Sequence, residues 1–570
     1  MTSNGKKPTV AYFCMEYGLN RELPIYSGGL GILAGDFLKA AKDENAPVIG
    51  IGILWKQDYT QQYIGDDRRP FDVYPNFDYS FLKDTGVSVQ LNVRGEEVTC
   101  KVHMVDQYGN APLYLLDTNF PGSSHGWMTS KLYGGVEQDR VAAEMILGIG
   151  GIKALRAMNI DIDQYHFNEG HAVFAGIELI REKMQEQHMS FEDAMTETKR
   201  QVAFTTHTPV EAGNEVHDHG LLEYMGAYNG LNRDQMTRIG GDPFGMTVAA
   251  LRLSHTANAV SQLHGDTARQ MWKDVSDAAP IISITNGVHG GTWQSPSIRN
   301  AYKQGRDLWQ PHMDLKEKLV RYIKEKTGKQ FKKENLIVGF ARRAAAYKRS
   351  GLIFSKPEVI EPLLQEGKLQ LVFSGKAHPK DEPGKDIIQN IMRMSEKYPD
   401  SIVFLENYDM YIGELLVQGV DVWLNNPRRP MEASGTSGMK AAMNGVLNVS
   451  VIDGWVPEGV EHRSSGWLID KMLTEMDQGD NEDVQDIKAL YRVLLDEVIP
   501  TYYNNRTKWL EMMHSSITMS KDQFSSARML KQYFSEMYEK NFEDDAPQMM
   551  AGAEQQNYSQ QNQYDQYPQQ

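Results

Sequence analysis

Cysteine and positive charge are both scarce in this 570-residue chain. Only Cys14 and Cys100 are present, so the sequence supports neither a disulfide framework nor a cysteine-based metal site, and it favours a reducing compartment. Its 59 basic residues are outnumbered by 75 acidic ones, which gives a net charge of −16. Because nucleic acids and anionic membranes require a basic surface, neither is an expected partner, and an anionic substrate would need a local basic pocket.

Long apolar runs and several catalytic signatures are also missing. No segment approaches the roughly 20 apolar residues of a membrane span, and no signal-peptide core precedes Glu16, so we expect a cytoplasmic protein. No G-x-S-x-G nucleophile elbow occurs. The stretch HTPVEAGNEVHDHG, which begins at His207, lacks the i, i+4 histidine pair of zinc helices, so no metal is predicted.

The 41% hydrophobic content suffices for two large cores. Short β-branched runs alternate with longer helical patterns, which predicts parallel sheets covered by helices. The expected strands are TVAYFCMEY, APVIGIGILW, QVAFTTHT, IISITNGV, NLIVGFARR, LQLVFSG, SIVFLENY, VDVWLNN and VLNVSVIDG. We therefore predict an α/β protein of two doubly wound, Rossmann-like lobes, with ligands in a cleft at the carboxyl ends of the strands.

A charged, weakly apolar stretch from Gln304 to Lys333 separates the two sets of strands. The predicted domains are an N-terminal lobe of residues 1–303, a C-terminal lobe of residues 304–520 and a helix of residues 521–545. Residues 546–570 are rich in Gln and Tyr without an apolar period, so we predict a disordered tail. This tail is either an association segment or, as we favour, an inert extension.

Two local patterns suggest phosphate binding. In YSGGLGILAGDF the glycines at 28, 29 and 31 precede a helix pattern, so backbone amides at a helix start could hold a phosphate. The stretch formally fits G-x-G-x-x-A, but NRELPIY separates it from the preceding strand, which weakens a dinucleotide site; a tight turn explains the glycines equally well. In GFARRAAAYKRSG a predicted strand is followed by four cations, Arg342, Arg343, Lys348 and Arg349. This cluster could bind a phosphate, or it could be an ordinary run of solvated surface charges.

Other polar residues stand at the ends of predicted strands. They are Glu169, His171, His207, Asn286 and Tyr408. The stretch EASGTSGMKAAMNG places Lys440 in an early helical turn, where a lysine taken alone is usually a solvated surface charge.

Seven segments, in one order along the chain, together resemble the α-glucan (glycogen and maltodextrin) phosphorylases, most closely their short form. The segments are EYGLNRELPIYSGGLGILAGDFLKAA, HFNEGHA, TTHTPVEAG, TNGVHGGTW, GFARRAAAYKR, FSGKAHPKD and FLENYDMYIGELLVQGVDVWLNNPRRPMEASGTSGMKAAMNG. The resemblance implies a GT-B glycosyltransferase that depends on pyridoxal phosphate and acts on an α-1,4-glucan and orthophosphate. Its implied reaction releases non-reducing-end glucose as α-glucose 1-phosphate with retention.

The resemblance also implies roles for individual residues. Lys440 matches the lysine that covalently holds pyridoxal phosphate, with Tyr408 nearby. Arg342, Arg343 and Lys348 match positions that bind the cofactor and reactant phosphates, whose mutual repulsion cations must neutralise. The remaining matches are the amides of Thr436 and Ser437 for the cofactor phosphate, the amide of Gly29 for the reactant phosphate, and, for the sugar, the carbonyl of His207 with His171, Asn286, Glu432, Ser434 and Gly435.

Two stretches depart from the short-form pattern: Gly290 and Gly291 replace an expected Val-Pro pair, and no second tryptophan follows Trp455. The extra length of the animal-type enzymes is missing, so their regulatory segments are not expected; a homo-oligomer is possible. Two other functions stay open, a cofactor-free GT-B glucan synthase that uses a sugar nucleotide and a catalytically silent glucan-binding protein. A synthase would not need the Lys440 block, and a silent binder would be expected to have lost Lys440, Arg343 or Lys348.

Overall fold

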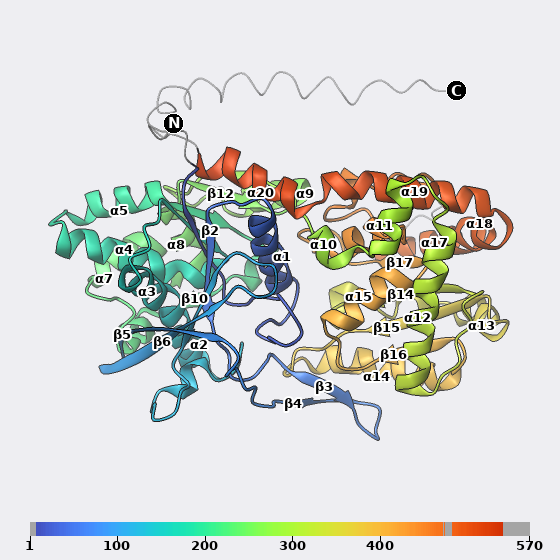
Figure 1. The fold of residues 1–570 in the computed structure, drawn as a ribbon, viewed down its shortest axis with the longest axis horizontal. Helices are drawn as coiled ribbons and strands as arrows, with labels where there is room; N and C mark the ends of the chain where they lie inside the picture. The colour runs from blue at the N-terminus through green and yellow to red at the C-terminus, as the bar shows by residue number, and fades with distance from the viewer. Residues whose placement is uncertain (1–6, 471, 473–480, 540–570) are drawn as a thin grey trace, which may run out of the picture.

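The computed structural model describes residues 7–470, 472 and 481–539 of the chain. It is an α/β protein built around two large sheets, which lie to the left and right in Figure 1. Within the described residues, none of the helices combines the length and apolar character needed to cross a bilayer. The predicted tail, residues 546–570, lies outside the described residues.

The first sheet has nine strands in the order β13-β12-β9-β8-β1-β2-β7-β6-β5. They are β1 (Val10–Phe13), β2 (Val48–Ile53), β5 (Lys83–Val93), β6 (Glu96–Val105), β7 (Leu113–Asp117), β8 (Gln164–Asn168), β9 (Val202–Thr205), β12 (Thr256–Ala259) and β13 (Ile281–Ser283). All pairs are parallel except β5–β6 and β6–β7, which are antiparallel. β8 returns beside β1 after β2 and β7 have been placed on the other side, which creates a topological switch point between β1 and β8.

The antiparallel hairpin β5–β6 differs from the expected all-parallel arrangement. Its strands alternate exposed and buried residues, as a strand covered on one face does. The turn residues Arg94 and Gly95 have φ values of 54° and 79°, the left-handed conformation that two-residue hairpin turns require.

The second sheet is wholly parallel, with six strands in the order β16-β15-β14-β17-β18-β19. They are β14 (Leu336–Ala341), β15 (Leu369–Ser374), β16 (Ile402–Leu405), β17 (Val422–Asn425), β18 (Leu447–Val451) and β19 (Gly466–Ile469). Counted from β14, this is the 3-2-1-4-5-6 order of the dinucleotide-binding fold, so its switch point lies between β14 and β17. Five of these six strands were predicted; β19 was not.

Helices cover the sheets much as the sequence patterns predicted. The stretch from Val136 forms one continuous helical unit, α2 (Glu137–Met145), a π-helical turn η2 (Ile146–Gly150) and α3 (Gly151–Ala157). The following pattern forms α4 (Val173–Glu186). The stretch expected only to separate the strand sets contains α12 (Trp309–Thr327), whose Leu319 and Ile323 are fully buried.

The last described residues return to the first sheet. After α19 (Arg506–Gln523), α20 (Ser526–Tyr533) and the turn Phe534–Tyr538 pack into the core of the first sheet, and Figure 1 shows these red helices along the top of the molecule. His166 of β8 joins Tyr538 Oη at 2.5 Å and Thr205 Oγ1 at 2.7 Å. The last described helical residues therefore belong to the same hydrophobic core as β1, the first strand of the chain.

A hairpin from the first half also reaches the second. It consists of β3 (Gln61–Ile64) and β4 (Pro70–Val73). The buried Gln62 side chain donates to the Ala377 carbonyl at 3.1 Å and accepts from the Ala377 amide at 2.8 Å. Arg69 forms ion pairs with Glu382 and Asp386 of α14 (Glu382–Lys397).

Candidate active site

The predicted cations gather at the switch point of the second sheet. Arg342 follows β14 directly, and its guanidinium donates to Asn425 Oδ1 at the end of β17 and to Glu432 Oε2. Lys348 Nζ donates to the same Glu432 oxygen at 2.5 Å. Because ligands of doubly wound sheets bind outside the carboxyl ends of the strands at this point, the location favours an anion-binding site.

Glu432 is nearly buried between these two cations. Burial alone would raise its pKa, but the charges of Arg342 and Lys348 lower the pKa of Glu432 to about 2. Its backbone amide donates to Asp453 Oδ2 at 3.0 Å. Arg343 is exposed, and within the described part of the chain its guanidinium makes no hydrogen bond or ion pair, so it is free to meet a ligand.

Lys440 is buried rather than solvated. It lies on α16 (Ser437–Met443) with 7% exposure, and its Nζ lies 3.9 Å from the ring centroid of Trp293. Burial lowers the pKa of its ammonium to about 8. Among the described residues Nζ has no hydrogen-bond acceptor, and the lowered pKa makes the neutral, nucleophilic amine more accessible than in an ordinary lysine.

Of the residues predicted to lie near Lys440, only Thr436 forms a hydrogen bond with it in the described structure. Thr436 caps α16, and its carbonyl accepts from the Lys440 amide at 3.1 Å. The Ser437 hydroxyl accepts from Trp423 Nε1 at 3.1 Å. Tyr408 lies at the end of β16, and burial raises its pKa to about 12. The structure does not join Lys440 to Arg342, Lys348 or Tyr408 by any hydrogen bond in the described residues.

Gly29 opens α1 (Gly29–Asp43), as the glycine pattern predicted. A side-chain carbon added at Gly28 or Gly29 would meet no described atom within 4 Å, so open space borders this helix start. The preceding amides of Ser27 and Gly28 donate to Glu16 Oε2 at 2.6 and 3.2 Å. Glu16, which follows β1, thus fixes the loop that presents Gly29.

His207 and Glu169 lie together at the carboxyl ends of β8 and β9. The backbone amide of His207 donates to Glu169 Oε1 at 2.5 Å, and its ring Nε2 lies 2.6 Å from Asn168 Oδ1. Burial, with the nearby His264 and His171, lowers the pKa of His207 to about 3. The imidazole is therefore neutral at physiological pH.

His171 faces Arg140 of α2. Arg140 Nη2 lies 3.0 Å from His171 Nε2, and since a guanidinium only donates, Nε2 accepts and the ring proton resides on Nδ1. That Nδ1 is buried and has no hydrogen-bond partner in the described structure. Burial, with the charge of Arg140, lowers the pKa of His171 to about 3. His171 thus presents an unused N–H donor.

Arg140 is held by Glu144 and Glu215, and His217 contacts Glu144 in turn. The side-chain ligand atoms of Glu144, Glu215 and His217 lie within 4.8 Å of one another, a spacing that could suit a metal ion. Arg140, however, already forms ion pairs with Glu144 at 3.3 Å and Glu215 at 2.9 Å, and His217 lies 3.1 Å from Glu144. The cluster serves the arginine in this structure.

Two predicted sugar-binding residues have unsatisfied polar atoms. Asn286 Oδ1 and Ser434 Oγ are buried without a hydrogen-bond partner in the described part of the chain. Buried polar groups are usually paired, so two orphans suggest that a polar ligand completes them. Beside Ser434, Gly435 has φ 79°, a left-handed conformation that favours glycine.

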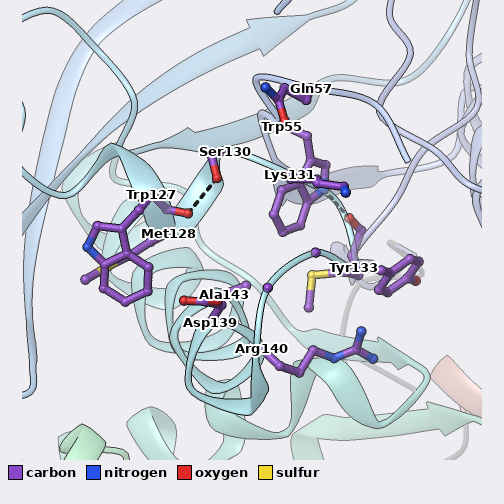
Figure 2. A pocket seen from close by; sticks show the side chains of 13 residues that line it. Trp55, Gln57, Trp127, Met128, Ser130, Lys131, Tyr133, Asp139, Arg140 and Ala143 are labelled. Carbon is purple, nitrogen blue, oxygen red and sulfur yellow. Dashed lines mark hydrogen bonds between the residues drawn. The ribbon is translucent and has the colours of Figure 1, made fainter. Parts of the chain in front are cut away.

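A cavity of about 220 Å³ lies in the first half of the chain, between residues that follow β1 and β2 and the segment from Trp127 to Ala143 (Figure 2). Its wall includes the aromatic rings of Trp55, Trp127 and Tyr133 and the charged side chains of Lys131 and Arg140. Figure 2 shows Tyr133 and Arg140 on the same side of the cavity. The Tyr133 hydroxyl donates to Glu16 Oε1 at 2.9 Å, so the cavity adjoins the loop that carries Gly29.

Glu16, Arg140, Asn168 and Asp453 were not singled out from the sequence. Each holds a predicted site residue or its loop in place. Glu16, Asn168 and Asp453 stand at or just after the carboxyl ends of β1, β8 and β18, and this position was the signal that could have identified them. Arg140 lies within a helix, and its contacts with His171 and Glu215 depend on chain segments far away in the sequence.

The chain is similar in sequence to known carbohydrate phosphorylases. The profile of the family described as carbohydrate phosphorylase matches residues 295–464. The chain is 38% identical to a maltodextrin phosphorylase of Thermococcus litoralis over 93% of this chain and 70% of the relative. It is 34% identical to a glycogen phosphorylase of Mycobacterium tuberculosis, over 93% of this chain and 70% of the relative. It is 33% identical to a glycogen phosphorylase of Aquifex aeolicus, over 94% of this chain and 86% of the relative.

Proposed function

The chain belongs to the carbohydrate phosphorylase family, and we propose that it is an α-glucan phosphorylase acting in the cytoplasm. It transfers the non-reducing-end glucose of glycogen or maltodextrin to orthophosphate and releases α-glucose 1-phosphate with retention. The observation that carries this proposal is the set of cations at the β14–β17 switch point, in a protein whose net charge is −16.

The side chains present fit pyridoxal phosphate. Lys440 supplies a buried amine with a pKa near 8 and no hydrogen-bond acceptor in the described residues, which suits covalent attachment to an aldehyde. Arg342, Lys348, Tyr408 and the amides of Thr436 and Ser437 would hold the rest of the group. When bound, the group would supply acid–base chemistry through its 5′-phosphate.

The chain's own residues would bind and orient the reactants. Arg343, which has no partner in the described structure, and the Gly29 amide beside open space would hold orthophosphate. Lys348 would share its charge between that phosphate and Glu432. These donors would stabilise the negative oxygens that assist departure of the glycosidic oxygen and then capture the sugar cation on the same face.

The sugar itself would meet neutral polar groups. The His207 carbonyl would face the ring, and Asn286, Glu432, Ser434, Gly435 and His171 would bind its hydroxyls. The orphan atoms Asn286 Oδ1 and Ser434 Oγ support this assignment because each could be satisfied by a sugar hydroxyl. Glu432 acts here as a binding group, unlike the paired carboxylates of a hydrolase.

The two sheets would form the two lobes of a GT-B enzyme with the reactants between them. We place the N-terminal lobe at residues 1–303 and the C-terminal lobe at residues 304–520. In the predicted terminal segment, residues 521–545, the described part contains the end of α19, α20 and the turn Phe534–Tyr538, and it is not one continuous helix. Contacts between the halves near the proposed site support this division: Ser261 donates to the Ala433 carbonyl at 2.6 Å, and Lys380 to the Gly135 carbonyl at 3.4 Å.

Phosphate dependence tests the function. With maltodextrin as substrate, glucose 1-phosphate should form only when orthophosphate is supplied, and the reverse reaction should extend a primer and release phosphate. UDP-glucose or ADP-glucose should not replace the sugar phosphate. Elongation only from a sugar nucleotide would identify a synthase, and binding without turnover would identify a silent glucan-binding protein.

The cofactor is tested separately. Borohydride reduction of the purified protein should fix one pyridoxal phosphate per chain on Lys440, as shown by absorption and by mass mapping of the labelled peptide. Lys440→Ala should abolish this covalent label. Label on a different lysine in the wild-type protein would refute the assignment.

A further inference from the structure

Glu169 has a strained backbone at the carboxyl end of β8. Its φ of 73° and ψ of 168° fall in a region that is essentially restricted to glycine. Its amide donates to the Thr205 carbonyl at 2.9 Å, so pairing with β9 holds the backbone there. Such conformations persist only where the surroundings enforce them, and they concentrate at functional sites.

The Glu169 side chain explains what this conformation achieves. It is 8% exposed, and its carboxylate accepts three hydrogen bonds. Oε1 accepts from the His207 amide at 2.5 Å and the Thr208 hydroxyl at 3.1 Å, and Oε2 from the Gly170 amide at 3.3 Å. One oxygen therefore binds the chain on both sides of the peptide group that carries the His207 carbonyl.

We propose that Glu169 is a positioning residue that directs the His207 carbonyl oxygen towards the reacting sugar. This inference rests on the function proposed above. The preceding residue, Asn168, holds the His207 ring at 2.6 Å, so two consecutive residues fix the ring and the backbone of one histidine. In this backbone conformation the carboxylate reaches the His207–Thr208 segment, and the kinetic test below separates a positioning role from a stabilising one.

Kinetics of Glu169→Asp and Glu169→Gln test the positioning role. Aspartate retracts the carboxylate by one methylene, so kcat for phosphorolysis should fall about 100-fold, the effect of a displacement of about 1 Å near a reacting centre. Glutamine keeps the length and one acceptor oxygen, so its kcat should fall less. The KM for orthophosphate should stay at the wild-type value in both variants, because Glu169 does not contact the cations at 342–348.

A matched control removes another buried carboxylate of the same half. Glu178 of α4 is fully buried and paired with Arg181, and Glu178→Gln should leave kcat unchanged. Wild-type kcat in both Glu169 variants would overturn the proposal. A rise in the KM for orthophosphate that accounts for the loss would also overturn it, since Glu169 would then serve phosphate binding.

The strain is tested without any assay of activity. Glycine normally lowers stability relative to alanine, but at a position with positive φ the order reverses. Glu169→Gly should therefore melt at a higher temperature than Glu169→Ala, although both lack the carboxylate. A higher melting temperature for the alanine variant would show that position 169 is not strained. If wild-type protein formed no glucose 1-phosphate, the proposed function would fail, whereas this comparison would still be informative.

Discussion

At the scale of single residues, the ion pairs of Glu432 decide which cations can meet a phosphate. Arg342 and Lys348 both donate to Glu432, whereas the exposed Arg343 has no partner among the described residues. Arg343 is therefore the cation that can bind orthophosphate without breaking an existing ion pair.

Replacing Arg343 by Lys keeps the charge and removes the planar fork that grips two phosphate oxygens. Glucose 1-phosphate formation should fall at least about 100-fold, the typical loss for one transition-state donor. Bound pyridoxal phosphate should change little, because Lys440, Arg342 and Lys348 are intact. The exposed Arg306 serves as control, and Arg306→Lys should behave as wild type. Undiminished turnover in Arg343→Lys would remove Arg343 from the site.

Lys440 links the site to stability through pH. Its pKa is lowered from 10.5 to about 8 by burial, so between these values the folded state binds fewer protons than the unfolded state. The free energy of unfolding of the cofactor-free protein should therefore rise as pH increases from about 8 to about 10.5. Urea unfolding across this range should show the rise relative to Lys440→Met, which has no titrating amine. Parallel curves for both proteins would contradict the lowered pKa.

At the scale of elements, the hairpin β3–β4 joins the two halves through contacts of unequal strength. Gln62 is buried and pairs with both backbone groups of Ala377, whereas Arg69 and its acidic partners lie near the surface. Buried hydrogen bonds and exposed ion pairs respond differently to mutation and salt.

Gln62→Ala should destabilise the protein by roughly 1–3 kcal/mol, because it leaves buried backbone groups unpaired. Arg69→Ala should destabilise the protein less than Gln62→Ala, and its effect should vanish near 1 M salt, where the screening length is about 3 Å. Urea unfolding at low and high NaCl measures both. The ranking is wrong if Arg69→Ala is the more destabilising variant at high salt.

The sequence predicted the elements of the second sheet better than those of the first. Runs such as NLIVGFARR are continuously apolar because both faces of a parallel sheet are covered, so they are easy to recognise. β5 and β6 carry polar residues on an exposed face, and β3–β4 depends on partners in α14, so neither was predicted. Arg342 and Lys348 stood out because they follow a predicted strand, whereas Glu432 was identified only through the family resemblance. The contacts among the three could not be predicted, because they depend on how β14 and β17 come together.

At the scale of the whole molecule, the last described residues complete the hydrophobic core around the first sheet. Met529, Leu530, Tyr533, Phe534, Met537 and Tyr538 are all buried in the first core. The sequence indicated a terminal helix but not where it would pack, because an apolar helix face does not specify which sheet will cover it.

Two truncations should therefore differ sharply. A protein ending at residue 545 loses only the Gln/Tyr-rich segment and should keep its melting temperature and specific activity. A protein ending at residue 525 loses six large buried side chains, each contributing about 1.5–3 kcal/mol, which together rival a total stability of about 5–15 kcal/mol. It should be unfolded or aggregated by circular dichroism and gel filtration. A drop in stability at the first cut would show that the tail docks on the fold.

The return of α20 to the first sheet also bears on how the protein is made. A ribosome releases β1, β8 and β9 long before it synthesises Tyr533 and Tyr538, which join Asn258 and His166 of that sheet. Until Tyr538 has been synthesised, an apolar face of the nascent first half stays uncovered, although N-terminal regions usually fold first during synthesis. A product terminated just before Ser526 would therefore expose this apolar face and tend to aggregate, even though both sheets had been translated in full.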